Sequence, residues 1–306
     1  MVLDIVGDVL LGTVLIPYYW LESLVLWLVP LRFQYKDISG QVVLVTGGGS
    51  GIGRIMCLRF SRLNCKVVTW DVNAQGNEET VKMIQSEGGT AYAYKVDLCN
   101  REEIYETAKR VEKEVGKVTI LVNNAGIVTG KRFLECSDDA IQRTMDVNVN
   151  AHFWTTKAFL PGMLKRSEGH VVTIASLAGL WGVNRLVDYC ASKFAAIGFD
   201  EALRTELKMD GHKGIKTTVV CPYFIDTGMF EGVKSRILPI LKPEYVVDKI
   251  MSGVLSNQEM VIIPGYSSFL LFLKAILPSN GLFKLLQTFG ASEAMDEFTG
   301  RAKKVL

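Results

Sequence analysis

The sequence predicts a doubly wound α/β fold in which helices cover both faces of one parallel sheet. From residue 42 onward, short apolar runs of the kind that form buried strands alternate with longer helical stretches. A glycine-rich turn joins the first run to the first helix, and polar residues follow several later runs. Repeated strand-then-helix units specify a parallel sheet, and ligands bind such sheets at the carboxyl ends of the strands. We therefore expect a single nucleotide-binding domain.

The overall composition excludes several classes of partner. The 306 residues include 34 basic and 32 acidic ones, and the net charge of +2 provides no extended basic field for nucleic acid. The six cysteines stand singly, and with only three histidines they form no metal-ligand pattern, so we expect no metal site. The chain has no Asn-x-Ser/Thr sequon. Isolated cysteines and the lack of a sequon fit a reducing compartment.

The N-terminal segment is far more apolar than the rest of the chain. Residues 9–31 are almost wholly apolar, and at about 1.5 Å per residue they could cross a hydrocarbon core of about 30 Å. Tyr18 and Trp20 are side chains that favour membrane interfaces. Because Pro17 and Glu22 interrupt the run, a monotopic or hairpin insertion competes with a full span, and a buried core helix is a third alternative. We predict that residues 1–35 are a membrane anchor.

The charges around this segment predict its orientation. Asp4 and Asp8 precede it, which is unlike a cleaved signal peptide, and Arg32 and Lys36 follow it. Basic residues stay on the cytosolic side of a membrane, so the bulk of the chain should face the cytosol. We expect the endoplasmic reticulum membrane as its location, with a lipid droplet as the alternative surface.

The glycine-rich turn has the context of a phosphate site. The apolar run 42–45 leads into Thr46-Gly47-Gly48-Gly49-Ser50-Gly51-Ile52-Gly53, and a helix begins near Arg54. Glycines allow a tight turn and a close approach of backbone to a pyrophosphate, while the helix N-terminus offers free N–H groups. This placement predicts a dinucleotide site.

The second strand predicts which dinucleotide binds. The run 66–70 ends in Asp71, whose carboxylate can accept hydrogen bonds from ribose hydroxyls and would repel a 2′-phosphate. Neither Val72 nor Asn73 supplies a cation for that phosphate, and the nearest candidate is Arg54. We therefore expect NAD rather than NADP.

Further strands bring more polar residues to the same edge of the sheet. A strand at 91–96 leads into Asp97, and one at 118–122 leads into Asn123-Asn124-Ala125-Gly126. Helices are expected at 101–115, 139–165, which carries Asn148, and 189–208, and the remaining strands at 170–175, 215–221 and 261–264. The strand at 170–175 places Ser176 at its carboxyl end.

Ser176, Tyr189 and Lys193 together suggest a site that removes a proton from an alcohol. Tyr189 and Lys193 are four residues apart, so a helix places them on one face. A nearby ammonium lowers the pKa of a phenol, which is otherwise a poor base at neutral pH. The tyrosine could then take the proton while the serine hydroxyl holds the same oxygen. An ordinary amphipathic helix is the alternative for the Tyr-x-x-x-Lys spacing alone.

Two later segments are also apolar. Residues 228–241 mix apolar side chains with two basic ones, and they could cover a site for a lipophilic substrate or simply pack in the core. In 266–290, Pro278-Ser279-Asn280-Gly281 divides an apolar stretch into two pieces too short to span a bilayer. We predict a domain at 36–265 and a C-terminal extension at 266–306, whose two helices lie at a membrane interface or the substrate mouth. Packing against a partner subunit is the alternative.

The motifs Thr46-Gly47-x-x-x-Gly51-x-Gly53 and Asn123-Asn124-Ala125-Gly126, followed by Asn148, Ser176, Tyr189 and Lys193, resemble the short-chain dehydrogenase/reductase family. The resemblance covers about residues 38–265 and implies a Rossmann-type sheet. One departure is Pro222-Tyr223, where the family often has Pro-Gly, although Thr227 remains placed to contact the nicotinamide carboxamide. The stretches 123–131, 188–196, 213–222 and 227–232 look like the membrane-associated 16C branch of the family.

This resemblance implies an NAD-dependent oxidation of all-trans-retinol to all-trans-retinal in a homodimer built on the long helices that contain Asn148 and Tyr189. Tyr189 would be the base, Ser176 would bind the substrate oxygen, Lys193 would bind the nicotinamide ribose, and Asn148 would hold a water on the proton path. The implied cofactor-binding residues are Thr46, Gly47, Ser50, Gly51, Ile52, Gly53, Asp71, Asp97, Asn123, Ala125, Tyr189, Lys193 and Thr227. A 17β-hydroxysteroid or another lipid alcohol is the alternative substrate. An inactive membrane or lipid-droplet scaffold is the alternative function, against which the intact catalytic set argues.

Overall fold

The computed structural model describes residues 2–236, 238–288, 290 and 293–300. It divides into two units, residues 1–37 and 38–306. The first unit contains helix α1 (Val2–Leu28) and a 3₁₀ turn (Leu31–Gln34). Large apolar side chains are exposed along α1, including Leu11, Trp20 and Leu24. Among the described residues, no helix combines the length and the apolar character that crossing a membrane requires.

The second unit is built on a sheet of seven parallel strands in the order β3-β2-β1-β4-β5-β6-β7, as far as the described residues show. The strands are β1 (Val42–Thr46), β2 (Lys66–Asp71), β3 (Ala91–Lys95), β4 (Val118–Asn123), β5 (Gly169–Ile174), β6 (Ile215–Pro222) and β7 (Met260–Ile263). All predicted strands are confirmed within a residue or two of their ends. From β1 the chain adds β2 and β3 on one side, and then crosses to the other side of β1 to add β4, β5, β6 and β7. The direction in which strands are added therefore reverses between β1 and β4.

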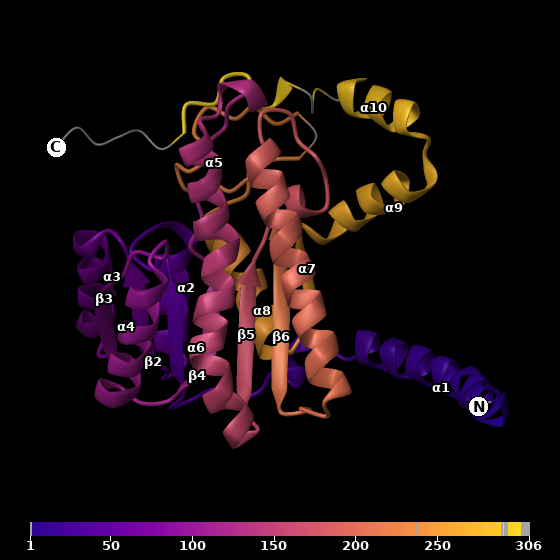
Figure 1. Ribbon diagram of the computed structural model, residues 1–306, viewed down its shortest axis with the longest axis horizontal. Coiled ribbons are helices and arrows are strands. Elements are labelled where there is room, and N and C mark those ends of the chain that lie inside the picture. Colours follow the sequence, from indigo (N-terminus) through magenta and orange to yellow (C-terminus); the bar gives the residue numbers. More distant parts are fainter. Residues whose placement is uncertain (1, 237, 289, 291–292, 301–306) are drawn as a thin grey trace. The chain divides into compact units, whose positions relative to one another are not determined.

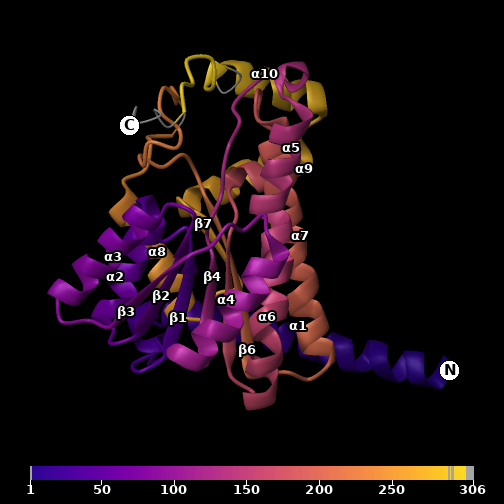
Figure 2. The same ribbon diagram turned by 60° about the vertical axis from the view of Figure 1, so that its left-hand side comes forward.

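Helices cover both faces of this sheet (Figure 2). One layer contains α2 (Gly51–Arg62), α3 (Ala74–Ser86) and α8 (Pro243–Leu255), and the other contains α4 (Arg101–Glu114), α6 (Ala151–Arg166) and α7 (Val187–Met209). Alternate strand residues supply the two cores. Val43 and Val45 pack toward the α2 layer, whereas Val42 and Leu44 pack toward the α4 layer. The predicted doubly wound fold is therefore confirmed.

The long helical segment predicted at 139–165 has a break that the sequence pattern does not indicate. Helix α5 (Asp138–Met145) continues into five residues of π-helix, Asp146–Asn150, before α6 begins. Asn148 is at the centre of this π-helix and is fully buried. An extra residue in a helical turn changes the direction of a side chain, and such insertions are frequent at functional sites.

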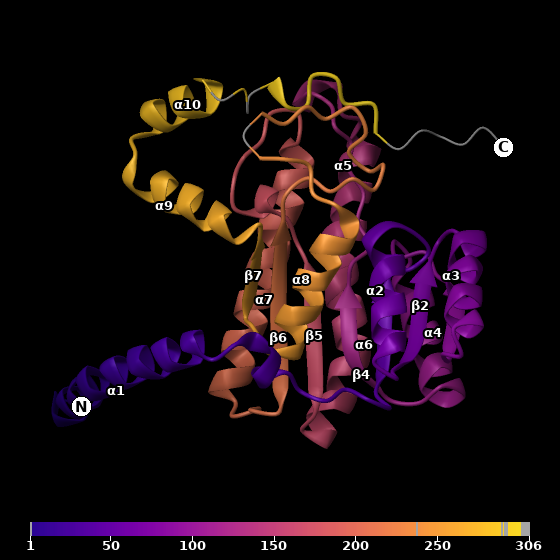
Figure 3. The same cartoon turned by 180° about the vertical axis from the view of Figure 1, so that it is seen from behind.

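The C-terminal segment forms the two predicted short helices, α9 (Ser268–Ile276) and α10 (Ser279–Thr288). Figures 1 and 3 show both beyond the carboxyl ends of the strands, at the end of the sheet where α5 also lies. Both helices carry exposed apolar side chains, including Phe269, Phe272 and Phe283. Residues 289, 291–292 and 301–306 of the predicted extension lie outside the described residues.

Candidate active site

A cavity of about 490 Å³ opens at the carboxyl ends of the strands. Its walls come from the loops after β1, β2, β3, β4, β5 and β6 and from the C-terminal segment. Twelve of the predicted site residues line it: Gly47, Ser50, Gly51, Ile52, Gly53, Asp71, Asp97, Ala125, Ser176, Tyr189, Lys193 and Thr227. Three predicted residues, Thr46, Asn123 and Asn148, do not line it.

The glycine-rich turn forms one end of this cavity. Gly51 starts α2 with a φ of 54°, a left-handed conformation that favours glycine. A Cβ on Gly53 would lie 2.1 Å from the Gly47 carbonyl oxygen, so only glycine allows the helix to approach the loop this closely. Ser50 precedes α2 without capping it through its side chain. The first N–H groups of α2 therefore remain available to a phosphate, and the turn fits a dinucleotide.

Asp71 ends β2 and helps to fix the same turn. Its two carboxylate oxygens accept hydrogen bonds from the backbone N–H groups of Gly49 and Asn73, both at 2.9 Å. Arg54, the candidate cation for a 2′-phosphate named from the sequence, is engaged elsewhere. Its guanidinium donates to the carbonyls of Gly49 and Gly76 and to the carboxylate of Glu79, at 2.6 to 3.0 Å. Arg54 therefore stabilises the glycine-rich turn, and its ion pair is with Glu79.

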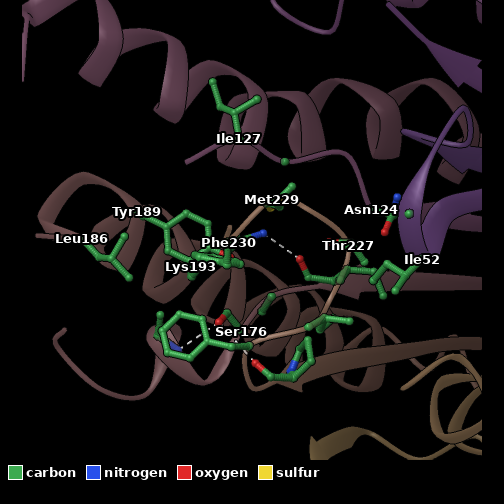
Figure 4. A pocket seen from close by; sticks show the side chains of 18 of the residues that line it. Ile52, Asn124, Ile127, Ser176, Leu186, Tyr189, Lys193, Thr227, Met229 and Phe230 are labelled. Atoms are coloured by element: carbon green, nitrogen blue, oxygen red, sulfur yellow. Dashed lines mark hydrogen bonds between the residues drawn. The ribbon is translucent and has the colours of Figure 1, made fainter. Parts of the chain in front are cut away.

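Ser176, Tyr189 and Lys193 meet on one wall of the cavity, while Thr227 and Ile52 lie toward its other end (Figure 4). The Ser176 hydroxyl donates to the Pro222 carbonyl at 3.3 Å and accepts from the Ala178 N–H at 3.1 Å. The Lys193 ammonium lies over the Tyr189 ring, 5.6 Å from its centre, and donates to the Ile174 carbonyl at 2.9 Å. The helical spacing thus brings the tyrosine and the lysine together, as the sequence predicts.

The pKa of Tyr189 differs from the sequence expectation. Burial is the largest influence and raises the pKa of the phenol above its ordinary value, while hydrogen bonding with the Ser176 side chain opposes this rise. Burial also lowers the pKa of Lys193 to about 8. Burial outweighs the other influences, so the pKa of Tyr189 is raised in this structure and the predicted lowering by Lys193 is not met. The Lys193 ammonium still lies over the ring while it donates to the Ile174 carbonyl.

The three predicted residues that do not line the cavity hold the backbone around it. The Thr46 hydroxyl accepts from the N–H groups of Asn124 and Ala125 at 2.9 and 3.1 Å. The Asn123 amide is bound by Thr155 on α6. All are buried. Thr46 and Asn123 therefore shape the turn after β4 without facing the cavity.

Asn148 joins three segments through its side-chain amide. It donates to the Ile127 carbonyl and to the Ser192 hydroxyl, each at 3.0 Å, and accepts from the Ile127 N–H at 2.9 Å. A Cβ built on Gly126 would lie 3.4 Å from the Asn148 Oδ1 and 3.5 Å from the Lys193 Nζ. The two catalytic candidates thus approach each other across Gly126.

The other half of the cavity is apolar and largely aromatic. The segment 228–241 supplies Met229, Phe230 and Leu238, and the Phe230 ring stands edge-on to Tyr189 with their centres 5.7 Å apart. Sequence reasoning did not single out Arg143, nor these residues of the apolar end: Trp181, Val183, Leu186 and Phe224. The position of Trp181, Val183 and Leu186 between Ser176 and Tyr189 could have indicated those three. Leu270, Phe283 and Leu286 of the lining belong to the two C-terminal helices that were predicted at a membrane interface or the substrate mouth.

Known proteins resemble this chain over most of its length. Residues 41–237 match the family model described as short chain dehydrogenase. Human epidermal retinol dehydrogenase 2 is 48% identical over 289 residues, 93% of each chain. Bovine short-chain dehydrogenase/reductase family 16C member 6 is 46% identical and covers 94% of this chain and 91% of its own. A solved short-chain dehydrogenase/reductase from Burkholderia phymatum in complex with NAD shares the fold, with a TM-score of 0.72, 24% identity, and coverage of 78% of this chain and 94% of its own.

The chain belongs to the short-chain dehydrogenase/reductase family. It is an alcohol dehydrogenase that uses a nicotinamide dinucleotide. The glycine turn at one end of the cavity and the Ser176, Tyr189 and Lys193 side chains on its wall agree with this class.

Proposed function

We propose that this enzyme oxidises a lipophilic alcohol with NAD, and that the alcohol is all-trans-retinol. The observation that carries the proposal is the composition of a single cavity. The glycine turn and Asp71 lie at one end, an apolar and aromatic chamber lies at the other, and Ser176, Tyr189 and Lys193 lie on its wall. Such a cavity can hold a dinucleotide and a long apolar alcohol at once.

The side chains divide the work as follows. The Ser176 hydroxyl binds the oxygen of the alcohol, and the Tyr189 phenolate removes its proton. Lys193 holds the ribose next to the nicotinamide and supplies positive charge beside the phenol, and Asn148 continues the proton path toward solvent. Thr227, which lines the cavity, would hold the carboxamide of the nicotinamide. NAD, when bound, would supply the acceptor for the hydride of the alcohol carbon.

The preference for NAD over NADP rests on Asp71 and Arg54. The Asp71 carboxylate is fixed at the end of β2 by two backbone N–H groups, where it would repel a 2′-phosphate. Arg54 cannot neutralise that phosphate without leaving two carbonyls and Glu79. We expect kcat/KM to be at least about tenfold higher with NAD than with NADP, a ratio equivalent to about 1.4 kcal/mol.

The choice of retinol rests on the relatives and on the apolar chamber. Epidermal retinol dehydrogenase 2, with 48% identity, takes its name from this substrate. A 17β-hydroxysteroid is the second candidate, because a steroid would also suit an apolar chamber. The deciding measurement is kcat/KM for all-trans-retinol and for estradiol, side by side, with full-length protein and NAD in detergent micelles. A higher value for estradiol would contradict the proposal.

Tyr189→Phe tests the assignment of the base. We expect kcat to fall by about 10² to 10⁴-fold, because the variant lacks the group that accepts the proton, while NADH binding measured by fluorescence changes little. For the unsubstituted enzyme, oxidation should become faster as the pH rises above neutral, since burial raises the pKa of the Tyr189 phenol. Retained turnover in the variant would refute the assignment. Absence of NADH formation with every lipid alcohol would favour the inactive scaffold.

We also propose that the enzyme works at the cytosolic face of the endoplasmic reticulum membrane or a lipid droplet, as a homodimer. The exposed apolar side chains along α1 and on α9 support an interfacial, monotopic contact with lipid. The exposed Phe153 of α6 and Val187 and Met209 of α7 support pairing through these helices. Flotation with liposomes and the mass of the detergent-solubilised particle by light scattering test the two statements separately.

A further inference from the structure

Asp188 is a buried carboxylate directly before Tyr189, and no step of the proposed reaction uses it. It lies in the first turn of α7, is only 6% exposed and does not line the cavity. A carboxylate this buried is costly unless it is bound by donors. Its position in the first turn of a 23-residue helix is favourable, because the helix dipole stabilises negative charge there.

The donors come from two segments that are distant in the sequence. The hydroxyl of Thr129, in the segment after β4, donates to Asp188 Oδ2. The hydroxyl of Thr144, on α5, lies 3.1 Å from the same oxygen and 2.9 Å from the Ala140 carbonyl. Within the described part of the chain, Oδ1 has no hydrogen-bond partner. One oxygen atom therefore joins the start of α7, the segment after β4 and α5.

Helix α7 and the segment after β4 are joined a second time on the other side of Tyr189, through the π-helix that follows α5. The Tyr189 carbonyl accepts from the Ser192 hydroxyl at 2.7 Å, and that hydroxyl accepts from Asn148. Asn148 in turn binds both backbone groups of Ile127, which lines the cavity. Tyr189 thus lies between two polar connections to the residues that follow β4.

We propose that Asp188 is a positioning residue, which fixes the Tyr189 ring and the segment 127–129, whose Ile127 lines the cavity, relative to each other by anchoring Thr129 and Thr144 to the first turn of α7. The inference rests on the proposed function, in which Tyr189 is the base that removes the proton of the alcohol. Without the Asp188 contacts, Tyr189 and the segment 127–129 can move apart. The glycine turn after β1 and Asp71 at the end of β2 stay in place.

The test compares Asp188→Ala with Asp188→Asn in the full chain. Asparagine keeps an oxygen of the same shape for the two hydroxyls, whereas alanine removes it. For Asp188→Ala we expect kcat for the alcohol to fall by up to about 10²-fold, the loss that a misplacement of about 1 Å can cause, while NADH binding stays within about twofold. Asp188→Asn should recover most of the activity. Asp139→Ala, an exposed acid in the first turn of α5, is the matched control and should change nothing.

A second measurement does not depend on turnover. Amide hydrogen exchange of a peptide spanning 124–132 should become faster in Asp188→Ala and stay unchanged in Asp188→Asn and Asp139→Ala. Thr129→Val, which removes one donor and keeps the carboxylate, should reproduce part of both effects. If Asp188→Ala does not fold, Thr129→Val and Asp188→Asn carry the test.

Three results would overturn the inference. They are wild-type kcat in Asp188→Ala, equal losses of turnover and NADH binding, and unchanged exchange at 124–132. If the unsubstituted enzyme itself oxidises no alcohol, the proposed function fails instead. In that case, amide hydrogen exchange at 124–132 still shows whether Asp188 holds this segment through Thr129.

Discussion

At the scale of single residues, Gly126 controls the approach of Asn148 and Lys193. A Cβ there would touch both side chains at distances of ordinary van der Waals contact, and the Gly126 backbone is not in the left-handed region. An alanine is therefore tolerated by the fold but fills the space in which Asn148 and Lys193 could share a bridging water. This makes Gly126 a place where the proton path can be blocked without breaking the structure.

We predict that Gly126→Ala lowers kcat for alcohol oxidation by about tenfold or more, because proton transfer loses its connection to solvent. The thermal midpoint should stay constant or rise slightly, as expected for Gly→Ala at a compatible conformation. Stopped-flow kinetics and thermal unfolding measure the two quantities. Gly198→Ala, on α7 with no neighbour near its Cβ position, is the control. Unchanged kcat in Gly126→Ala would remove Asn148 from the proton path.

Residue-level reasoning from the sequence succeeds where chemistry follows from local spacing. Tyr189 and Lys193 are one helical turn apart, and Asp71 ends a strand, so both positions could be predicted. Thr46, Asn123 and Asn148 were predicted at the site, but their side chains turn to the protein interior. The anchor at Asp188 escaped notice because Thr129 and Thr144 meet it only in three dimensions.

At the scale of elements, Lys274 joins α9 to the loop that follows Ser176 and to α7. Lys274 donates to the Leu180 carbonyl at 2.6 Å, and its ammonium lies over the rings of Trp181 and Phe194 at 5.6 and 5.4 Å. The same helix places Leu270 on the cavity wall. The lysine therefore connects the apolar C-terminal helices to the loop that follows Ser176.

We predict that Lys274→Met raises KM for the lipid alcohol by about threefold to tenfold, or about 0.7 to 1.4 kcal/mol, which is within the range of a lost cation–π contact. The KM for NAD should not change, because the contacts of Lys274 are with Leu180, Trp181 and Phe194. Steady-state kinetics at fixed saturating NAD measures the effect. Lys284→Met on α10, where the ammonium binds only Gln287 in the described structure, should behave like the unsubstituted enzyme. Equal effects of the two substitutions would contradict a specific role for Lys274.

The elements themselves were predictable, because hydrophobic periodicity reports burial on a sheet face or helix face. The two short helices at 268–276 and 279–288 followed from the apolar run and its Pro-Ser-Asn-Gly break. The π-helix at 146–150 was not predictable, because one inserted residue alters the helical phase without leaving a compositional signal. The attachment of α9 by Lys274 depends on tertiary contacts that the pattern does not contain.

At the scale of the whole molecule, the catalytic unit from Ile38 onward contains every residue that lines the cavity. We therefore predict that a chain lacking residues 2–35 binds NADH with unchanged affinity but no longer floats with liposomes, apart from a weak residual association through 266–290. Fluorescence titration measures the NADH affinity, and flotation followed by immunoblotting measures the association with liposomes. Full-length protein that stays in solution without detergent would contradict the role of the N-terminal segment.

The order of the strands has a consequence for the synthesis of the chain. β1 lies at the centre of the sheet and pairs with β4, with Val43 opposite Ile120. This part of the sheet can form only after Ile120 has left the ribosome. The cavity gains its last wall only with Ala294. During this interval the apolar faces that will line the substrate chamber are exposed to the cell, which makes the nascent enzyme a client for chaperones. Long-range parallel pairing also makes folding intrinsically slow. The cavity is thus complete only after residue 294 has been synthesised.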